Sequence, residues 1–127
     1  MSGSTDWYYQ REGAQKAAGR VHGVVHAAGS RITQPYVSNL DLDEWKRVLD
    51  ADVNGFLHVA KAAIPHFRAK GGGAFTFVST AGLARFSPGD ILSIGPKGAI
   101  EALLFLMPLV GIGLLRYVRH GVTRRDR

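Results

Sequence analysis

The stretch VHGVVHAAG, residues 21–29, decides the fold that the sequence predicts. It is short, rich in valine and ends in small residues, which is typical of a buried strand that runs into a loop. A second stretch, AFTFVS at residues 74–79, alternates in polarity and predicts another strand. Helical periodicity surrounds both. Because helix, strand, helix, strand, helix is the order of parallel βαβ units, the sequence predicts an α/β protein.

Three segments carry the helical periodicity. The first is WYYQREGAQKAA, residues 7–18. The second begins at Asp41-Leu42-Asp43-Glu44, which has the spacing of a capping box, and runs to the glycines at 71–73 with a kink expected at Pro65. The third follows Pro96, because proline favours the first turn of a helix. In βαβ units the crossover helices cover the sheet.

Composition restricts the classes of function. The chain has 127 residues, 46% of them hydrophobic, which suits one globular domain. The last twelve residues hold five arginines and one aspartate, so they carry +4 of the net charge of +6. A basic tail of this kind favours a solvated terminus over a nucleic-acid surface. The absence of cysteine excludes disulfides and thiolate chemistry.

The histidines do not have the spacing of a metal site. His22 and His26 lie four apart on an expected strand, where that spacing does not converge as it does on a helix. His58 and His66 lie eight apart on an expected helix, with no carboxylate arranged beside them. We therefore expect no bound metal.

The termini bear on localisation. The start, MSGSTDWYYQREG, lacks the basic residues and apolar core of a secretory signal, so a cytoplasmic protein is expected. The segment ALLFLMPLVGIGLL, residues 102–115, is apolar but shorter than the ~20 residues that span a bilayer, and Pro108 weakens a helix there. A buried helix is favoured, and membrane attachment through residues 102–118 stays an alternative.

Candidate site residues follow the two predicted strands. Ligands bind at the carboxyl ends of parallel strands, which here are Ala27-Ala28-Gly29 and Ser79. Small residues let a ligand approach the backbone, and a serine would place a hydroxyl in the same crevice. Lys97, near the start of the third helix, can point toward that edge. A close-packed strand end, a turn cap and a solvated helix start are the alternatives.

Four stretches in this order resemble the short-chain dehydrogenase/reductase family over residues 15–104. VVHAAG resembles a strand ending in Asn-Asn-Ala-Gly, with Ala28-Gly29 retained and His26-Ala27 replacing the asparagines. The family's long helix with Asn-x-x-Gly is resembled by EWKRVLDADVNGFLHVAKAAIPHF. Its strand that delivers the catalytic serine is resembled by GGGAFTFVSTAG, and its helix with Tyr-x-x-x-Lys is resembled by KGAIEAL. The resemblance implies a partial Rossmann-like fold, a three-layer fragment of a doubly wound parallel sheet.

The resemblance also implies a function, hydride transfer between a small alcohol or carbonyl compound and NAD or NADP. It assigns Ser79 and Lys97 as catalytic residues, with Asp52 in place of the asparagine and Ser93 in place of the tyrosine. It assigns cofactor binding to Ala27, Ala28, Gly29 and Lys97.

Two of these positions differ from the family in their chemistry. A phenol can be tuned toward neutrality, whereas the aliphatic hydroxyl of Ser93 cannot, so proton transfer there is not expected. Pro96 should also break the one-turn alignment of Ser93 with Lys97. Asp52, as a carboxylate, could pair with Lys97 directly.

The two ends of the chain differ from the family as well. No Gly-rich turn between a strand and a helix precedes residue 21, and the segment after residue 104 lacks the family's next strand. We therefore expect a partial Rossmann-like domain over 1–104 and a divergent apolar segment with a basic tail over 105–127. Such a truncated chain would be weak or inactive as isolated.

An interaction module is the alternative function. The family's dimer interface uses the helices that correspond to 43–69 and 97–115, so a homo-oligomer is expected in either case. A non-catalytic module of this kind would use the same two helices to bind a partner. No nucleic-acid partner is expected.

Overall fold

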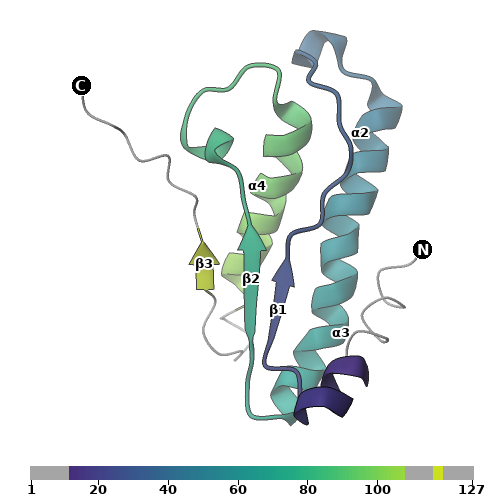
Figure 1. Cartoon of the computed structure of the whole chain (residues 1–127). Coiled ribbons are helices and arrows are strands. Elements are labelled where there is room, and N and C mark those ends of the chain that lie inside the picture. Colours follow the sequence, from purple (N-terminus) through teal and green to yellow (C-terminus); the bar gives the residue numbers. More distant parts are fainter. Residues whose placement is uncertain (1–11, 108–115, 119–127) are drawn as a thin grey trace.

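Figure 1 shows the computed structural model of the chain, which describes residues 12–107 and 116–118. The strands are β1 (Gly23–His26), β2 (Ala74–Val78) and β3 (Arg116–Val118). The helices are α2 (Leu42–Leu49), α3 (Gly55–Ala69) and α4 (Ile91–Leu106), and residues 12–18 are also helical. Short helical turns are η1 (Val37–Asn39), η2 (Asp50–Asn54) and η3 (Ala81–Ala84).

The three strands form one parallel sheet in the order β1-β2-β3, which confirms the α/β prediction. Val24 pairs with Phe75, and Thr76 pairs with Arg116. The third strand was not expected from the sequence. It has only three residues, too few to show a period, and its pairing with β2 depends on contacts with the rest of the fold.

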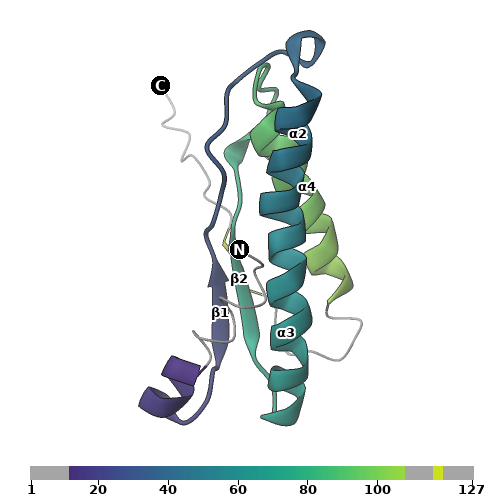
Figure 2. The same cartoon turned by 90° about the vertical axis from the view of Figure 1, so that its right-hand side faces the viewer.

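Helices α3 and α4 cover one face of the sheet, and α2 continues that layer beyond the ends of the strands (Figure 2). Of the three expected layers, the described residues therefore build the sheet and one helical layer. Side chains alternate between the faces of a strand, so Phe75 and Phe77 point toward the helices and are buried. On the other face Val25 is 71% exposed and Val78 is 41% exposed.

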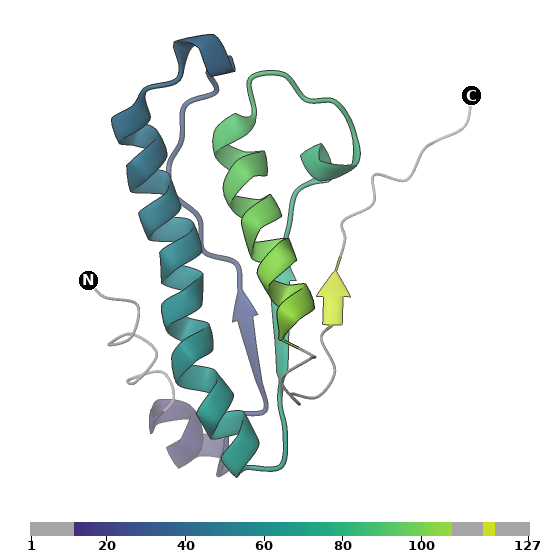
Figure 3. The ribbon, with the colours of Figure 1, turned by 180° about the vertical axis from the view of Figure 1, so that it is seen from behind.

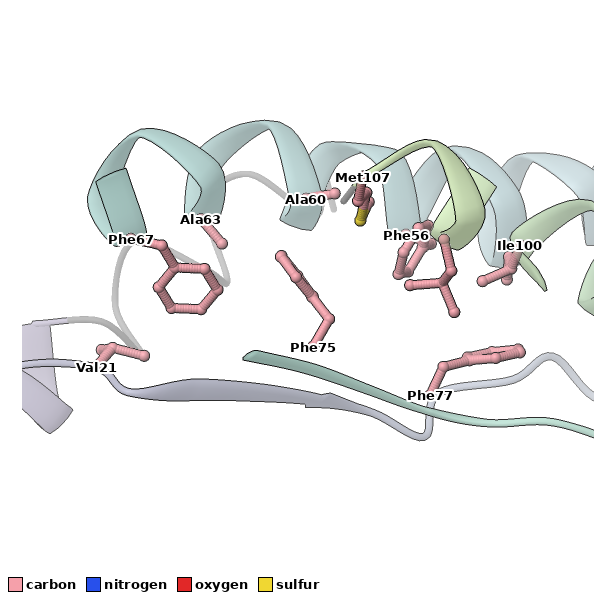
Figure 4. Packing of buried hydrophobic residues seen from close by; sticks show 10 residues of the cluster. Val21, Phe56, Ala60, Ala63, Phe67, Phe75, Phe77, Ile100 and Met107 are labelled. Carbon is pink, nitrogen blue, oxygen red and sulfur yellow. The ribbon is translucent and has the colours of Figure 1, made fainter. Parts of the chain in front are cut away.

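The core lies between the sheet and α3 and α4 (Figure 4). Its main members are Phe56, Phe67, Phe75 and Phe77, with Val21, Ala60, Ala63, Ile100, Leu104 and Met107 around them. The rings of Phe67 and Phe75 meet edge to face, with centroids 5.3 Å apart. The alanines give the rings room to approach α3. Burial of these aromatic residues is the main contribution to the stability of the fold.

The long second helix begins where the sequence predicted, but its cap is different. The carboxylate of Asp41 accepts a hydrogen bond from the Asp43 N–H at 2.9 Å. Glu44 does not close the expected capping box. Its carboxylate instead accepts from the N–H and hydroxyl of Thr33, at 3.0 and 2.7 Å, because the loop after β1 passes within its reach. The residue thus ties that loop to α2.

The irregular part of the long helix lies at η2, a π-helical turn, rather than at Pro65. The helix remains helical through Pro65, which lies on its exposed side. A π-helical turn inserts an extra residue and shifts the side chains on the helix surface. In this chain it turns Asp52 into the protein, where that side chain is buried.

The third helix begins at Ile91, so Pro96 lies inside α4 and not at its start. Proline disfavours a helical residue before it mainly by a clash with that residue's Cβ, and here the preceding residue is Gly95. The same glycine lets α2 approach, because a Cβ at Gly95 would lie 2.8 Å from Cη2 of Trp45. The missing side chain thus permits both the proline and the helix crossing.

Polar contacts fix the amino end of β1. The Arg20 guanidinium donates to the carbonyl oxygens of Lys70 and Gly72, which follow α3. The Val21 N–H donates to Nε2 of the buried His66 at 3.3 Å. These bonds hold the start of β1 against the turn that leads into β2, and so position the parallel pair.

None of the helices in the described residues combines the length and apolar character needed to cross a membrane. The expected apolar segment over 102–115 falls partly outside the described residues. Its described part completes α4, where Leu104 and Met107 are buried in the core.

Candidate active site

The candidate site lies at the carboxyl ends of β1 and β2, which point the same way in Figure 1. Ala27, Ala28 and Gly29 follow β1 and are exposed, and Ser79 follows β2 and is half-buried. The loops beyond them meet, since a Cβ on Gly89 would lie 3.2 Å from the Gln34 carbonyl oxygen. The parallel topology therefore brings the predicted small residues and the predicted serine to one edge.

The hydroxyl of Ser79 donates a hydrogen bond to Oε1 of Glu101, which lies 22 residues later on α4. Sequence reasoning did not identify Glu101. The available signal was its spacing, because Glu101 lies four residues after Lys97 and therefore on the same helix face.

Lys97 and Ser93 are aligned on α4. The Lys97 ammonium donates to Oγ of Ser93 at 3.4 Å, and both residues are half-buried. The prediction that Pro96 would break this alignment is wrong, because α4 continues through the proline. Ser93 thus holds the lysine side chain along the helix.

Asp52 binds the loop after β1. Its Oδ1 accepts from the N–H of Ser30 at 3.0 Å and from the hydroxyl of Ser30 at 2.7 Å. In the described part of the chain no ion pair joins Asp52 to Lys97, so the pairing that a carboxylate would permit is not formed. The π-helical turn directs this carboxylate toward the loop, and Asp52 anchors the backbone that carries Gly29.

His26, the last residue of β1, is buried between aromatic rings. Its ring lies edge-on to Phe56, with centroids 5.2 Å apart, and stacks on Phe77 at 6.0 Å. Burial lowers the pKa of His26 below its ordinary value of 6.5, and the nearby Asp52 carboxylate partly opposes this shift. Its Nε2 is buried and makes no hydrogen bond. Folding therefore favours the neutral imidazole.

Lowering the pH from about 7 to about 5 is expected to destabilise the fold through His26. Because the folded-state pKa lies below 6.5, the unfolded chain takes up the proton first. The contribution to stability is complete above pH 6.5 and falls as the pH drops below it. Urea midpoints at the two pH values measure this loss. The variant His26→Asn should lose less stability over this range, and an equal loss in both proteins would contradict the assignment.

The residues present fit one half of a nicotinamide dinucleotide. A Cβ at Gly29 would meet nothing within 4 Å, so the backbone of residues 27–29 is open to a flat ring or a ribose. Lys97 supplies a cation on α4, the helix that Ser79 contacts through Glu101. The described residues do not fit the pyrophosphate. Residues 12–22, which precede β1 in the described chain, form no Gly-rich turn from a strand into a helix.

A model of one protein family, described as enoyl-(acyl carrier protein) reductase, matches residues 6–105. The chain belongs to the short-chain dehydrogenase/reductase family. This short-chain dehydrogenase/reductase is 38% identical over 55 residues to a trans-4-hydroxycyclohexanecarboxylate dehydrogenase from Sinomonas cyclohexanicum. That match covers 43% of this chain and 21% of the other protein. The resemblance inferred from the four motifs is thereby confirmed.

Solved structures agree in fold. A short-chain dehydrogenase/reductase from Mycobacterium ulcerans has a TM-score of 0.78 and 25% identity, over 91% of this chain and 43% of that one. The KRED1-Pglu enzyme has a TM-score of 0.80 and 19% identity, over 95% and 50%. An NAD+-bound xylitol dehydrogenase has a TM-score of 0.74 and 21% identity, over 84% and 41%. This family member spans half or less of each relative's length.

Proposed function

We propose that this chain carries the substrate half of an NAD(P)-dependent oxidoreductase, which moves hydride between a small alcohol and its carbonyl form. The observation that carries the proposal is the hydrogen bond from Ser79, which follows β2, to Glu101 on α4, the helix that also holds Lys97, at the sheet edge where residues 27–29 follow β1. Membership of the short-chain dehydrogenase/reductase family supports it.

Each residue has a separate task in this proposal. The Ser79 hydroxyl binds the oxygen of the substrate. Lys97 binds the ribose hydroxyls of the cofactor, and the backbone of residues 27–29 lies against the nicotinamide. Asp52 keeps that backbone in place through Ser30. The bound nicotinamide would supply or accept hydride.

Ser93 takes a supporting task. It replaces the family's tyrosine, and an aliphatic hydroxyl, unlike a phenol, cannot be tuned to ionise near neutral pH. Its hydrogen bond to Lys97 holds the ammonium along α4. Proton transfer in this chain therefore needs another group.

Titration of the purified chain with NADH and NADPH tests the cofactor site. We expect saturable quenching of tryptophan emission in the micromolar range, with Trp45 on α2 as one reporter. Lys97→Ala should weaken binding about tenfold or more. Lys46→Ala is the matched control, since Lys46 is a lysine whose side chain is 75% exposed. No binding up to millimolar cofactor would refute the proposed function.

Loss of the serine hydroxyl tests the substrate site. In a chain that binds cofactor, Ser79→Ala is expected to lower kcat for alcohol oxidation by about 100-fold and to leave NADH affinity within about twofold. The reason is that Ser79 contacts the substrate and not the ribose. Equal turnover of the variant and the wild type would remove Ser79 from the site.

We further propose a homodimer formed through the outer surfaces of α3 and α4, which lie side by side in Figure 3. Leu57 on α3 and Phe105 and Leu106 on α4 are exposed apolar side chains. Exposed apolar surface of this kind favours association. Light scattering after size exclusion should give twice the chain mass, and Phe105→Lys should give the monomer. A wild-type monomer at high concentration would contradict the dimer.

A further inference from the structure

The hydrogen bond between Ser79 and Glu101 has a fixed direction. A carboxylate can only accept hydrogen bonds, and a serine hydroxyl has a single proton. The structure shows that proton donated to Oε1 of Glu101. The oxygen of Ser79 is therefore left with lone pairs for its second partner and has no proton to donate.

We propose that Glu101 is a positioning residue that makes Ser79 a proton acceptor in the site. The inference rests on the proposed function. It names the group that accepts the proton in place of the tyrosine, a task that Ser93 cannot perform. It assigns the substrate in the favoured ground state as the alcohol, since an alcohol hydroxyl can donate to Ser79 and a carbonyl oxygen cannot.

The arrangement on α4 supports this assignment. Ser93, Lys97 and Glu101 follow one another at four-residue spacing and so share one helix face. Lys97 donates to Ser93, and Ser79 donates to Glu101, which gives two short polar pairs along that face. Ser79 follows β2, at the sheet edge where residues 27–29 follow β1.

The proton path is balanced for oxidation of a secondary alcohol. The carbinol C–H bond breaks and its electron pair leaves as hydride to the nicotinamide cofactor of the proposed function, while the C–O bond becomes a carbonyl. The hydroxyl proton of the substrate passes to Oγ of Ser79 as the serine's own proton passes to Oε1 of Glu101. Glu101 ends as a neutral acid and returns its proton to water. The reverse sequence reduces the carbonyl.

A proton resonance tests the inference without any need for turnover. A serine hydroxyl proton held by a carboxylate is expected as a separate downfield signal in the proton NMR spectrum of the full chain. The signal should disappear in Ser79→Ala and in Glu101→Leu, and should persist in the control Ser87→Ala and in Ser79→Thr, which keeps a hydroxyl. Absence of the signal in the wild type, or its survival in Glu101→Leu, would overturn the proposal.

Kinetics with cyclohexanol as the probe alcohol give a second test. Glu101→Gln is expected to lower kcat about 100-fold with KM within about threefold, because it removes a proton acceptor and not a substrate contact. A lower kcat combined with a raised KM and a lower melting temperature would indicate a structural role and overturn the proposal. A chain that binds neither NADH nor NADPH refutes the proposed function instead, and the proton resonance then decides the inference alone.

Discussion

Replacing Phe67 by alanine is expected to lower the free energy of unfolding by about 3–5 kcal/mol. Phe67 is fully buried and its ring packs edge to face on Phe75. The turn after α3 is built around this ring, since a Cβ at Gly73 would lie 2.2 Å from Cδ1 of Phe67. Truncation therefore removes core packing and leaves a cavity beside the turn. Urea denaturation followed by far-UV circular dichroism measures the loss.

Phe86→Ala is the matched control for this substitution. Phe86 is 90% exposed, so its truncation should change the free energy of unfolding by about 0.5 kcal/mol or less. Similar losses in the two variants would mean that the aromatic core described here does not dominate stability. A loss of stability confined to Phe67→Ala would support the dominant role of this core.

Replacing Asp52 by alanine is expected to lower the free energy of unfolding by about 2–3 kcal/mol. The substitution removes the acceptor of two hydrogen bonds and leaves the Ser30 N–H without its partner in a partly buried position. The loop after β1 then loses its tie to the π-helical turn. Amide hydrogen exchange of residues 27–33 should rise together with the drop in stability.

Asp52→Asn separates the charge from the hydrogen bonds. It keeps Oδ1 as an acceptor for Ser30, so it should cost about 1 kcal/mol or less. It also restores the residue type that the family has at this position. A loss as large as that of Asp52→Ala would show that the negative charge matters more than the hydrogen bonds.

The sequence predicted most of the elements because their signals are local. The strand at 74–79 and the helix start at Asp41 depend on alternation and on a side-chain cap, which neighbouring residues determine. The boundaries were less well predicted. Residues 21–26 have strand-like composition, yet β1 begins only at Gly23, because a strand extends only where the neighbouring strand offers pairing.

The errors share one physical cause, which is that distant residues decided the outcome. Pro96 was expected to begin a helix, and Gly95 before it allowed the helix to pass. Asp52 could have paired with Lys97, and the loop carrying Ser30 reached it instead. Glu101 was missed because its hydrogen bond joins two elements that only the fold brings together. The helix spacing alone gave no reason to link it to Ser79.

The outer edge of β1 has a consequence for handling the protein. Within the described residues β1 pairs with β2 alone, so its other edge presents unpaired backbone groups beside the exposed Val25. Such an edge is a template for addition of strands from other molecules. The net charge of +6 opposes this self-association, and that repulsion is screened over ~10 Å at about 0.1 M salt. Salt should therefore promote precipitation of a chain that low ionic strength keeps dispersed.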